Sequence, residues 1–370
     1  MKKQWYLAFC LIAIFLLGIV GCSQDVKPTE QPQTTPGAET TPSAESILLK
    51  LNTFEPKQSG IPETDGKDIW EWWAEEVEKR SGGRVEVDVY YSESLVKDTD
   101  ALGALDSGIC DVVQHSSGRI PNRFPIGNAL ITGSPLAYIG KYNDLGLKER
   151  MEWQVRVLNE LQTAGLLKEF DGFKVIFWSP VEPSILFFRN KKVTTLEELE
   201  GMRIRVNIAA QKLVVEKLGA TPVAIDTSEL YSSVERGLVD GVAITSVPLE
   251  TWKLGELVKY GVDYGVGGGM MVGLMKEERW NSLPEDIRTV MDELNAELQN
   301  AWVCWQAQRG EQARKKFVEG GGEIYKLSAE EAARWDQRVT EALDLTLAEL
   351  ESMDLPVKKV LEVVETVEAR

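Results

Sequence analysis

Two arginines in an apolar strand pattern limit what this chain can fold into more than any other feature. Met202, Ile204 and Val206 alternate with Arg203 and Arg205. This is the period of a β-strand, so both arginines leave the same face. A buried strand can keep an arginine only if an anion neutralises its charge. The pattern therefore predicts an anion-binding site at this strand.

The residues around this strand alternate between strand and helix patterns. Apolar residues in 213–218 are spaced as on a helix face, and 222–224 is a short strand pattern. Asp226 and Glu229 have the spacing of a capping box, which predicts the start of a second helix. The order strand, helix, strand, helix is typical of an α/β fold in which helices pack on a sheet.

The same stretch resembles the DctP-type solute-binding proteins of tripartite ATP-independent periplasmic (TRAP) transporters. The resemblance rests on G-x-R-I-R-V from Gly201, L-G-A-T-P-V from Leu218, S-E-L-Y from Ser228 and G-L-V-D-G from Gly237. It extends more weakly from Ser46 to the C-terminal region. It implies a two-lobed fold of the periplasmic-binding-protein (Venus-flytrap) type, a long helix that spans both lobes, and a ligand carboxylate paired with Arg205.

The N-terminal residues predict export and lipidation. Lys2 and Lys3 precede an apolar run and the sequence I-V-G-C, which predicts a lipoprotein signal peptide over 1–21 and a lipidated Cys22. The alternative is a single membrane anchor, but about 16 apolar residues are fewer than the roughly 20 needed to span a bilayer. Residues 22–46 are rich in Thr, Pro, Glu and Gln, and we expect a disordered tether. The predicted location is extracytoplasmic, with a lipid anchor in the bacterial cell membrane, in the periplasm or on the outer face.

The remaining chain is long enough for two lobes around a cleft. Two prolines within 179–183 predict a crossover between the lobes, and the helix pattern over 284–318 is long enough to pass both. The predicted division is 47–181 plus 270–305 for lobe I, 182–269 plus 306–350 for lobe II, and 351–370 for a C-terminal helix.

Two loops are expected at the cleft, because ligands of open α/β sheets collect at the carboxyl ends of strands. The first follows the strand pattern at 47–51 and contains Phe54; the second follows the pattern at 110–114 and contains Ser116 and Arg119. The resemblance also implies ligand contacts for Ser116 and Arg119, and the alternative for Arg119 is a solvated loop arginine. His115, the single histidine, is interpreted as a loop residue without a role in proton transfer.

Three positions depart from the family pattern. Ile185 stands where members that bind sialic acid have a second carboxylate-facing arginine, Ile244 where asparagine is usual, and Thr227 where an aromatic residue is common. We therefore expect one charged anchor and apolar walls, which favour a small organic monocarboxylate with an apolar, branched or aromatic remainder over sialic acids and C4-dicarboxylates. The predicted ligand-binding residues are Phe54, Ser116, Arg119, Trp178, Ile185, Arg205, Asn207, Thr227, Tyr231 and Ile244.

Several other function classes are disfavoured. The formal charge is −17 and no basic cluster is present, which argues against binding nucleic acid. The single histidine and the lack of G-x-S-x-G and H-E-x-x-H argue against an enzyme. The GVGGG run at 265–269 lacks the ending of a phosphate-binding loop and is interpreted as a hinge or a tight strand entry. No cofactor or metal site is predicted, although a cation beside a carboxylate ligand stays open.

Three hypotheses of function remain. The favoured one is a solute-binding lipoprotein that delivers an organic acid to TRAP membrane subunits. A binding protein that presents its ligand to a membrane receptor would use the same fold, and an exported enzyme is the third. Cys110 and Cys304 remain after Cys10 is removed and Cys22 is lipidated; they either pair or stay as free thiols, and free thiols are favoured.

Overall fold

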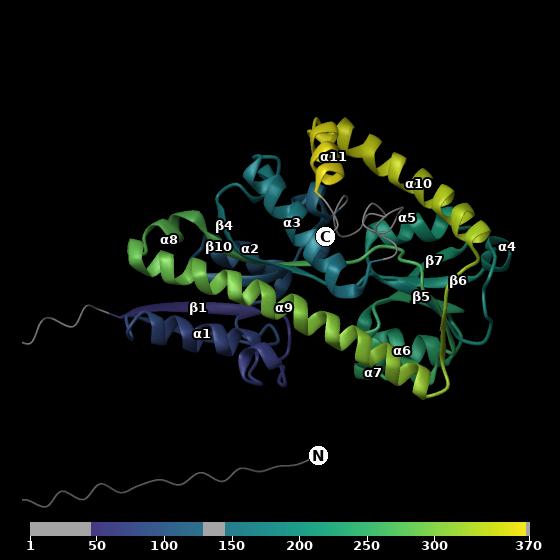
Figure 1. The fold of residues 1–370 in the computed structure, drawn as a ribbon, viewed down its shortest axis with the longest axis horizontal. Coiled ribbons are helices and arrows are strands. Elements are labelled where there is room, and N and C mark those ends of the chain that lie inside the picture. Colours follow the sequence, from purple (N-terminus) through teal and green to yellow (C-terminus); the bar gives the residue numbers. More distant parts are fainter. Residues whose placement is uncertain (1–45, 129–144, 368–370) are drawn as a thin grey trace, which may run out of the picture. The chain divides into compact units, whose positions relative to one another are not determined.

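Two β-sheets with helices packed against them organise the computed structural model of this protein (Figure 1). The structure describes residues 46–128 and 145–367. The predicted signal peptide, the lipidated Cys22 and nearly all of the predicted tether lie outside the described residues.

The first sheet has five strands in the order β2-β1-β3-β10-β4. β1 pairs in parallel with β2 and β3, whereas β10 is antiparallel to both β3 and β4. The strands are β1 (Ile47–Thr53), β2 (Val85–Tyr90), β3 (Val112–Ser116), β4 (Phe173–Pro180) and β10 (Met270–Lys276). The loops after β1 and β3 therefore leave the same edge, as the sequence predicted.

The second sheet has six strands in the order β11-β9-β5-β8-β6-β7. β6 is parallel to β7 and β8, and β5 is antiparallel to β8 and β9. The strands are β5 (Ile185–Phe188), β6 (Arg203–Val206), β7 (Thr221–Ala224), β8 (Gly241–Ile244), β9 (Tyr260–Val262) and β11 (Glu323–Tyr325). The strand that carries the two arginines thus lies inside this sheet.

In several α-helices of the described residues, the sequence supplies a capping residue and apolar residues at helical spacing. At α1, for example, the Asp68 side chain accepts from the backbone N–H of Trp70 at 2.8 Å, and Trp73 and Val77 are buried one turn apart. The helices are α1 (Ile69–Arg80), α2 (Ala101–Asp106), α3 (Leu147–Thr163), α4 (Leu196–Leu199), α5 (Ala209–Lys217), α6 (Thr227–Glu235), α7 (Val247–Thr251), α8 (Glu277–Asn281), α9 (Glu285–Glu319), α10 (Ala329–Ser352) and α11 (Val357–Thr366).

The six-stranded sheet is covered by helices on both faces. Ile204 and Val206 belong to an apolar cluster with α5 and α10, while Val242 and Ile244 belong to a second cluster with α6, α7 and the end of α9. Because successive side chains of a strand alternate between faces, Arg205 leaves the sheet on the second side.

Two short connections join the sheets and pair with each other. The backbone N–H of Ser184 donates to Gly267 O at 2.7 Å, and the N–H of Val266 donates to Ser184 O at 2.8 Å. The predicted crossover at 179–183 begins too early, because β4 continues to Pro180. Proline is tolerated there, since β4 is an edge strand and Pro180 lies at its end.

Helix α9, of 35 residues, is the third connection and contacts both sheets. In Figure 1 it runs past β1 and α1 and ends beside α6 and α7. This is the long helix that the sequence predicted. The exact division into lobes stays a prediction.

Two local features were not predicted, and one local prediction is wrong. After β8, helix α7 ends at Thr251, because Lys253 adopts the left-handed conformation with φ 56°. β11 was not anticipated, and it pairs only with the equally short β9. Asp226 does precede α6, but its side chain makes no capping hydrogen bond, so the predicted capping box does not form.

Candidate ligand-binding site

A cavity of about 1330 Å³ lies where the ends of strands from both sheets meet α9. The first sheet contributes the loops after β1 and β3 and the start of β10, and the second contributes the residues that follow β6, β7 and β8. The lining includes Phe54, Glu55, Gln58, Ser116, Arg119, Glu182, Arg205, Asn207, Ile208, Lys212, Ile225, Asp226, Thr227, Thr245, Trp252, Met270, Met271, Trp305 and Arg309.

Arg205 is the deeply buried cation of this cavity, with 1% of its surface exposed. Its Nε donates to Ile225 O at 3.1 Å, and its Nη1 has no hydrogen-bond partner within the described residues. Burial lowers the pKa of Arg205 to about 10, an effect that the nearby Asp226 partly opposes. The guanidinium therefore stays charged at neutral pH and has a donor to spare, which is the requirement for holding a carboxylate.

Arg203 shares the strand face with Arg205, as predicted, but its charge is already neutralised. It pairs with Asp240 at 2.9 Å and also donates to Gly237 O. The side chain is 45% exposed, and Arg203 does not line the cavity.

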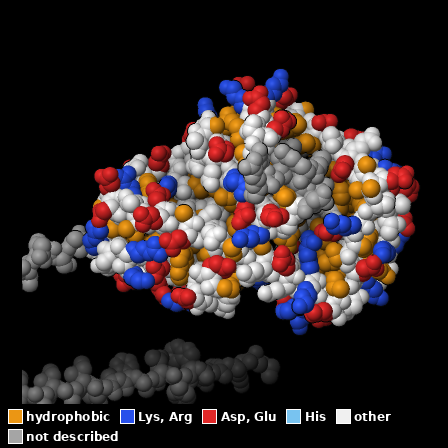
Figure 2. Space-filling view, in the orientation of Figure 1, with side chains coloured by type: hydrophobic (Ala, Val, Ile, Leu, Met, Phe, Trp, Pro, Cys, Tyr) orange, Lys and Arg blue, Asp and Glu red, His pale blue; other side chains and the backbone are white. Residues whose placement is uncertain are grey.

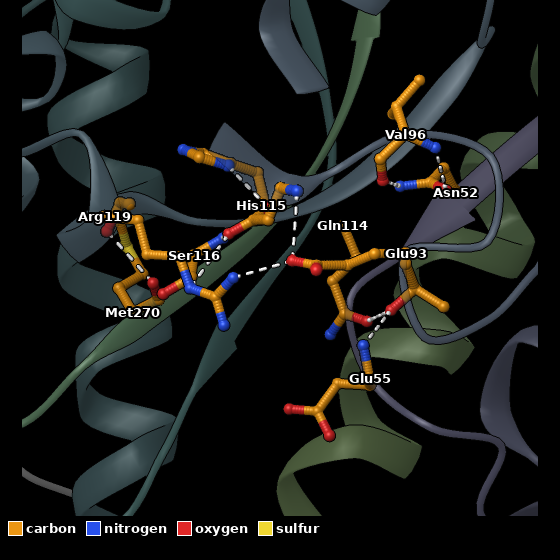
Figure 3. A network of polar contacts seen from close by, with 12 residues as sticks. Asn52, Glu55, Glu93, Val96, Gln114, His115, Ser116, Arg119 and Met270 are labelled. Carbon is orange, nitrogen blue, oxygen red and sulfur yellow. Dashed lines mark hydrogen bonds and ion pairs between the residues drawn. The ribbon is translucent and has the colours of Figure 1, made fainter. Parts of the chain in front are cut away.

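Arg119 reaches the cavity from the short turn after β3 and is held by two carboxylates. Its Nη1 donates to Glu93 Oε1 at 2.8 Å, and its Nε lies 3.5 Å from Asp98 Oδ2. The guanidinium also lies over the ring of Phe54, 4.9 Å from its centroid. Figure 3 shows this network together with Ser116, whose backbone N–H is 3.3 Å from the same Asp98 oxygen.

His115 belongs to this network and not to a loop. It lies in β3 with no exposed surface, and its Nδ1 is 2.8 Å from Asp98 Oδ1. Its prediction as a loop residue is wrong, because β3 continues two residues beyond the predicted end.

Six of the ten predicted ligand-binding residues line the cavity. They are Phe54, Ser116, Arg119, Arg205, Asn207 and Thr227.

The structure places the other four in the apolar core or against it and not in the cavity lining, which corrects their expected position on the wall. Trp178 donates to Asn159 Oδ1 at 2.9 Å and packs edge-on against Phe170. Ile185 and Ile244 face each other across β5 and β8 in the cluster under α6 and α7, and Tyr231 packs on the same cluster. Ile244 ends its strand inside the core, and the next residue, Thr245, lines the cavity.

A second polar group of the cavity was not predicted from the sequence; its residues lie on the loop after β1 and on α9. Arg309 lies over the ring of Trp305 at 4.8 Å and donates to Gln58 Oε1. Gln58 Nε2 in turn donates to Glu55 Oε2 at 2.9 Å. No local motif marks these residues, because Arg309 is separated from Glu55 by most of the chain.

Glu182 was also missed, and it fixes the crossover beside the cavity. Its Oε1 accepts from the backbone N–H groups of Ser246 at 2.6 Å and Val247 at 3.1 Å, and its Oε2 lies 3.8 Å from Arg314 Nε. Burial raises the pKa of Glu182, and Arg314 opposes that shift. The side chain ties the crossover to the start of α7 and to α9.

The described ranges contain no group of three or more His, Cys, Asp or Glu side chains arranged to hold a metal ion. Cys110 and Cys304 are free thiols. None of the helices in those ranges is both long enough and apolar enough to cross a membrane. Acidic and basic side chains are interspersed on the face drawn in Figure 2.

The model of the DctP family, described as bacterial extracellular solute-binding protein, family 7, matches residues 62–349. The chain belongs to this family. A DctP protein is a solute-binding protein, and its family places it outside the cytoplasm, where it works with membrane permease subunits.

Several relatives cover most of this chain. The C4-dicarboxylate-binding periplasmic protein DctP of Rhodobacter capsulatus is 26% identical over 307 residues, which are 81% of this chain and 86% of the relative. A TRAP periplasmic solute-binding protein of Desulfovibrio salexigens has a TM-score of 0.73 at 22% identity, over 87% of this chain and 95% of its own. A marine metagenome TRAP protein specific for aromatic acid ligands, solved with 3-hydroxybenzoate, has a TM-score of 0.72 at 21% identity, over 87% and 98%. The predicted two-lobed α/β fold is confirmed.

Proposed function

We propose that this DctP protein captures a small organic monocarboxylate with an apolar or aromatic remainder and delivers it to TRAP membrane subunits. The observation that carries the proposal is the buried guanidinium of Arg205, whose Nη1 has no partner within the described residues. An arginine can hold a carboxylate by two parallel hydrogen bonds, which both neutralises the charge and satisfies the donors.

A single carboxylate is favoured because other cations of the cavity already have anionic neighbours. Arg119 pairs with Glu93 and Asp98, and Lys57 pairs with Glu71 at 2.8 Å. Arg309 is linked to Glu55 through Gln58. Ile185 and Ile244 do not contribute to this selectivity, since both side chains lie in the core.

The walls of the cavity support an apolar or aromatic remainder. Phe54, Trp252 and Trp305 offer ring surfaces, and Met270 and Met271 offer adaptable apolar contacts. The metagenome protein with the same fold was solved with an aromatic acid, whereas the Rhodobacter relative is named for C4-dicarboxylates. Both ligand classes contain the carboxylate that Arg205 is proposed to bind.

The test is titration calorimetry of Arg205 variants against aromatic and branched monocarboxylates. Arg205→Ala is expected to lose about 2–5 kcal/mol of binding free energy, roughly a thirtyfold to several-thousandfold loss of affinity. Arg205→Lys is expected not to restore binding, because an ammonium does not reproduce the planar fork.

Arg203→Ala is the matched control, because it removes an arginine from the same strand face outside the cavity. It is expected to leave affinity unchanged. Parental affinity in Arg205→Ala would show that the ligand is held elsewhere. Strong binding of succinate or malate, with none of the monocarboxylates, would refute the proposed ligand class.

We also propose that Cys22 is lipidated and holds the protein at the membrane. The support is the I-V-G-C sequence after the apolar run and the tether composition of 22–46. Cys22→Ser is expected to move the protein from the membrane fraction to the soluble fraction, and an unchanged distribution would contradict the proposal.

A further inference from the structure

The second polar group of the cavity contains donor and acceptor atoms that are not used within the group. We call Glu55, Gln58, Arg309 and the underlying Trp305 the Glu55 cluster. Glu55 and Gln58 come from the loop after β1, on the five-stranded sheet, and Arg309 and Trp305 come from α9. Arg205 belongs to the six-stranded sheet, so the cluster approaches the cavity from other elements.

Gln58 uses both ends of its amide inside the cluster. Its Nε2 donates to Glu55 Oε2, and its Oε1 accepts from Arg309 Nη1. The second carboxylate oxygen of Glu55 and the remaining N–H groups of Arg309 make no further hydrogen bond to described residues. The cavity therefore meets one free acceptor and several free donors at the same place.

The charges of the cluster limit what can bind there. Burial raises the pKa of Glu55, and the nearby Arg309 opposes this shift; burial lowers the pKa of Arg309, and Glu55 opposes that one. Each charge thus stabilises the other. A second ligand carboxylate would meet the charge of Glu55, and a ligand ammonium would meet that of Arg309.

A neutral ligand group that both donates and accepts hydrogen bonds is repelled neither by Glu55 nor by Arg309. Such a group can donate to the free oxygen of Glu55 and accept from Arg309. Trp305 is 4% exposed and supports the Arg309 guanidinium from below, so the donors are held in place before the ligand arrives.

We propose that the Glu55 cluster selects ligands that bear a neutral hydroxyl or carboxamide group in addition to the carboxylate held by Arg205. The inference rests on the proposed function, since it specifies the remainder of the same organic acid. It makes Glu55 and Arg309 specificity-determining residues of the cavity.

Calorimetry with two matched series of acids tests the inference on the parent protein. The aromatic series is benzoate, 3-hydroxybenzoate and isophthalate; the aliphatic series is valerate, 5-hydroxyvalerate and glutarate. In the series that fits the cavity, the hydroxylated acid is expected to bind on the order of tenfold more tightly than the unsubstituted one, since it adds a hydrogen bond to Glu55 and one to Arg309. The dicarboxylate is expected to bind most weakly.

Two variants assign this preference to the cluster. Glu55→Gln keeps the shape but removes the negative charge, so the dicarboxylate is expected to gain about tenfold or more in affinity. Arg309→Met is expected to reduce the affinity for the hydroxylated acid to that for the unsubstituted acid. Glu75→Gln, which breaks an exposed ion pair with Lys67 away from the cavity, is the control and is expected to change neither.

The outcomes separate this inference from the proposed function. Binding of the unsubstituted and hydroxylated acids with equal affinity, or a dicarboxylate affinity that Glu55→Gln leaves unchanged, would overturn the inference and leave the function intact. Failure of every acid to bind at millimolar concentration would overturn both.

Discussion

Glu169, in the short turn before β4, is a half-buried carboxylate that accepts two backbone hydrogen bonds from residues 126–127. Its Oε2 accepts from the N–H of Ile126 at 2.9 Å, and its Oε1 from that of Gly127 at 2.7 Å. Burial raises the pKa of Glu169 from 4.5 to about 7, although these hydrogen bonds and Arg123 favour the charged form. Desolvation therefore outweighs the hydrogen bonds at this residue.

This shift makes stability depend on pH. A carboxyl group whose pKa is raised by folding contributes its full stabilisation below the unfolded pKa and loses it as the pH rises through the folded value. For Glu169 the loss falls between about pH 4.5 and about pH 7. Glutamine does not titrate, so the free energy of unfolding of the parent, relative to Glu169→Gln, is expected to fall by about 1–3 kcal/mol between pH 5 and pH 8.

Urea denaturation at several pH values measures this difference. Glu160→Gln, which removes an exposed carboxylate from α3, is the control for the loss of a charge. A difference between parent and Glu169→Gln that stays constant from pH 5 to pH 8 would refute the assignment.

Arg203 and Arg205 show how far the sequence determines the site at the scale of residues. Alternation placed both on one face, and the resemblance favoured Arg205. The two arginines differ because Asp240 lies beside the start of β6, where its carboxylate neutralises Arg203. The partner of a strand residue depends on which segments pair with the strand, and periodicity alone does not give that information.

At the scale of elements, α9 is the part of the fold that both sheets share. Gln299 exchanges hydrogen bonds with the backbone of Trp178 in β4, at 2.8 Å and 2.6 Å, and Trp302 Nε1 donates to Pro180 O at 2.8 Å. About three turns later, Arg314 of α9 donates to Asp263 Oδ1 at 2.8 Å, directly after β9 of the six-stranded sheet. Gly310 lies between these contacts, where Glu182 approaches the helix.

Gly310 is expected to be required for this approach. A Cβ at this position would lie 3.0 Å from Glu182 Oε2 and 2.9 Å from Leu147 Cδ1. Glu182 has little freedom to move, because its other oxygen is bound to Ser246 and Val247. Gly310→Ala is therefore expected to destabilise the protein by about 1–3 kcal/mol, although alanine is the better helix former.

Gly103→Ala in α2 is the matched control, because a Cβ there meets nothing within 4 Å. It is expected to stabilise the protein by about 0.5–1 kcal/mol. Thermal denaturation of both variants measures the contrast. Stabilisation by Gly310→Ala would show that the contact between Glu182 and α9 is loose.

Long elements were easier to predict from the sequence than short ones. α9 was predicted within one residue at each end, because its pattern persists over many turns. β9 and β11 contain three residues each, too few for a period to show. Ile185 and Ile244 lie on β5 and β8, but their side chains point under α6 and α7 and not into the cavity, because the helices cover that face.

At the scale of the whole molecule, the cavity is larger than a typical ligand site. Its volume of about 1330 Å³ exceeds the roughly 300–1,000 Å³ that usually encloses a small ligand. Residues of both sheets line it, and the two short crossovers beside it pair through two backbone hydrogen bonds. These features favour closure of the sheets around the ligand by bending at the crossovers.

Small-angle X-ray scattering with and without a saturating acid measures this closure. The radius of gyration is expected to decrease on binding. The Arg205→Ala variant at the same acid concentration is the control, since it is expected not to bind and therefore not to close. An identical profile for the parent in both conditions would indicate a rigid cavity.

The order of the strands also has a consequence for biosynthesis. β10 lies between β3 and β4, yet it begins at Met270, after five strands of the other sheet have been made. The strands β1 to β4 therefore leave the ribosome long before β10, which lies between β3 and β4, has been synthesised. The six-stranded sheet is completed later still, when β11 (Glu323–Tyr325) has been synthesised. Since nascent chains fold as their segments emerge, neither sheet can be completed while the N-terminal half alone is outside the ribosome. Such an order suits a polypeptide that threads through a translocation channel first and folds afterwards.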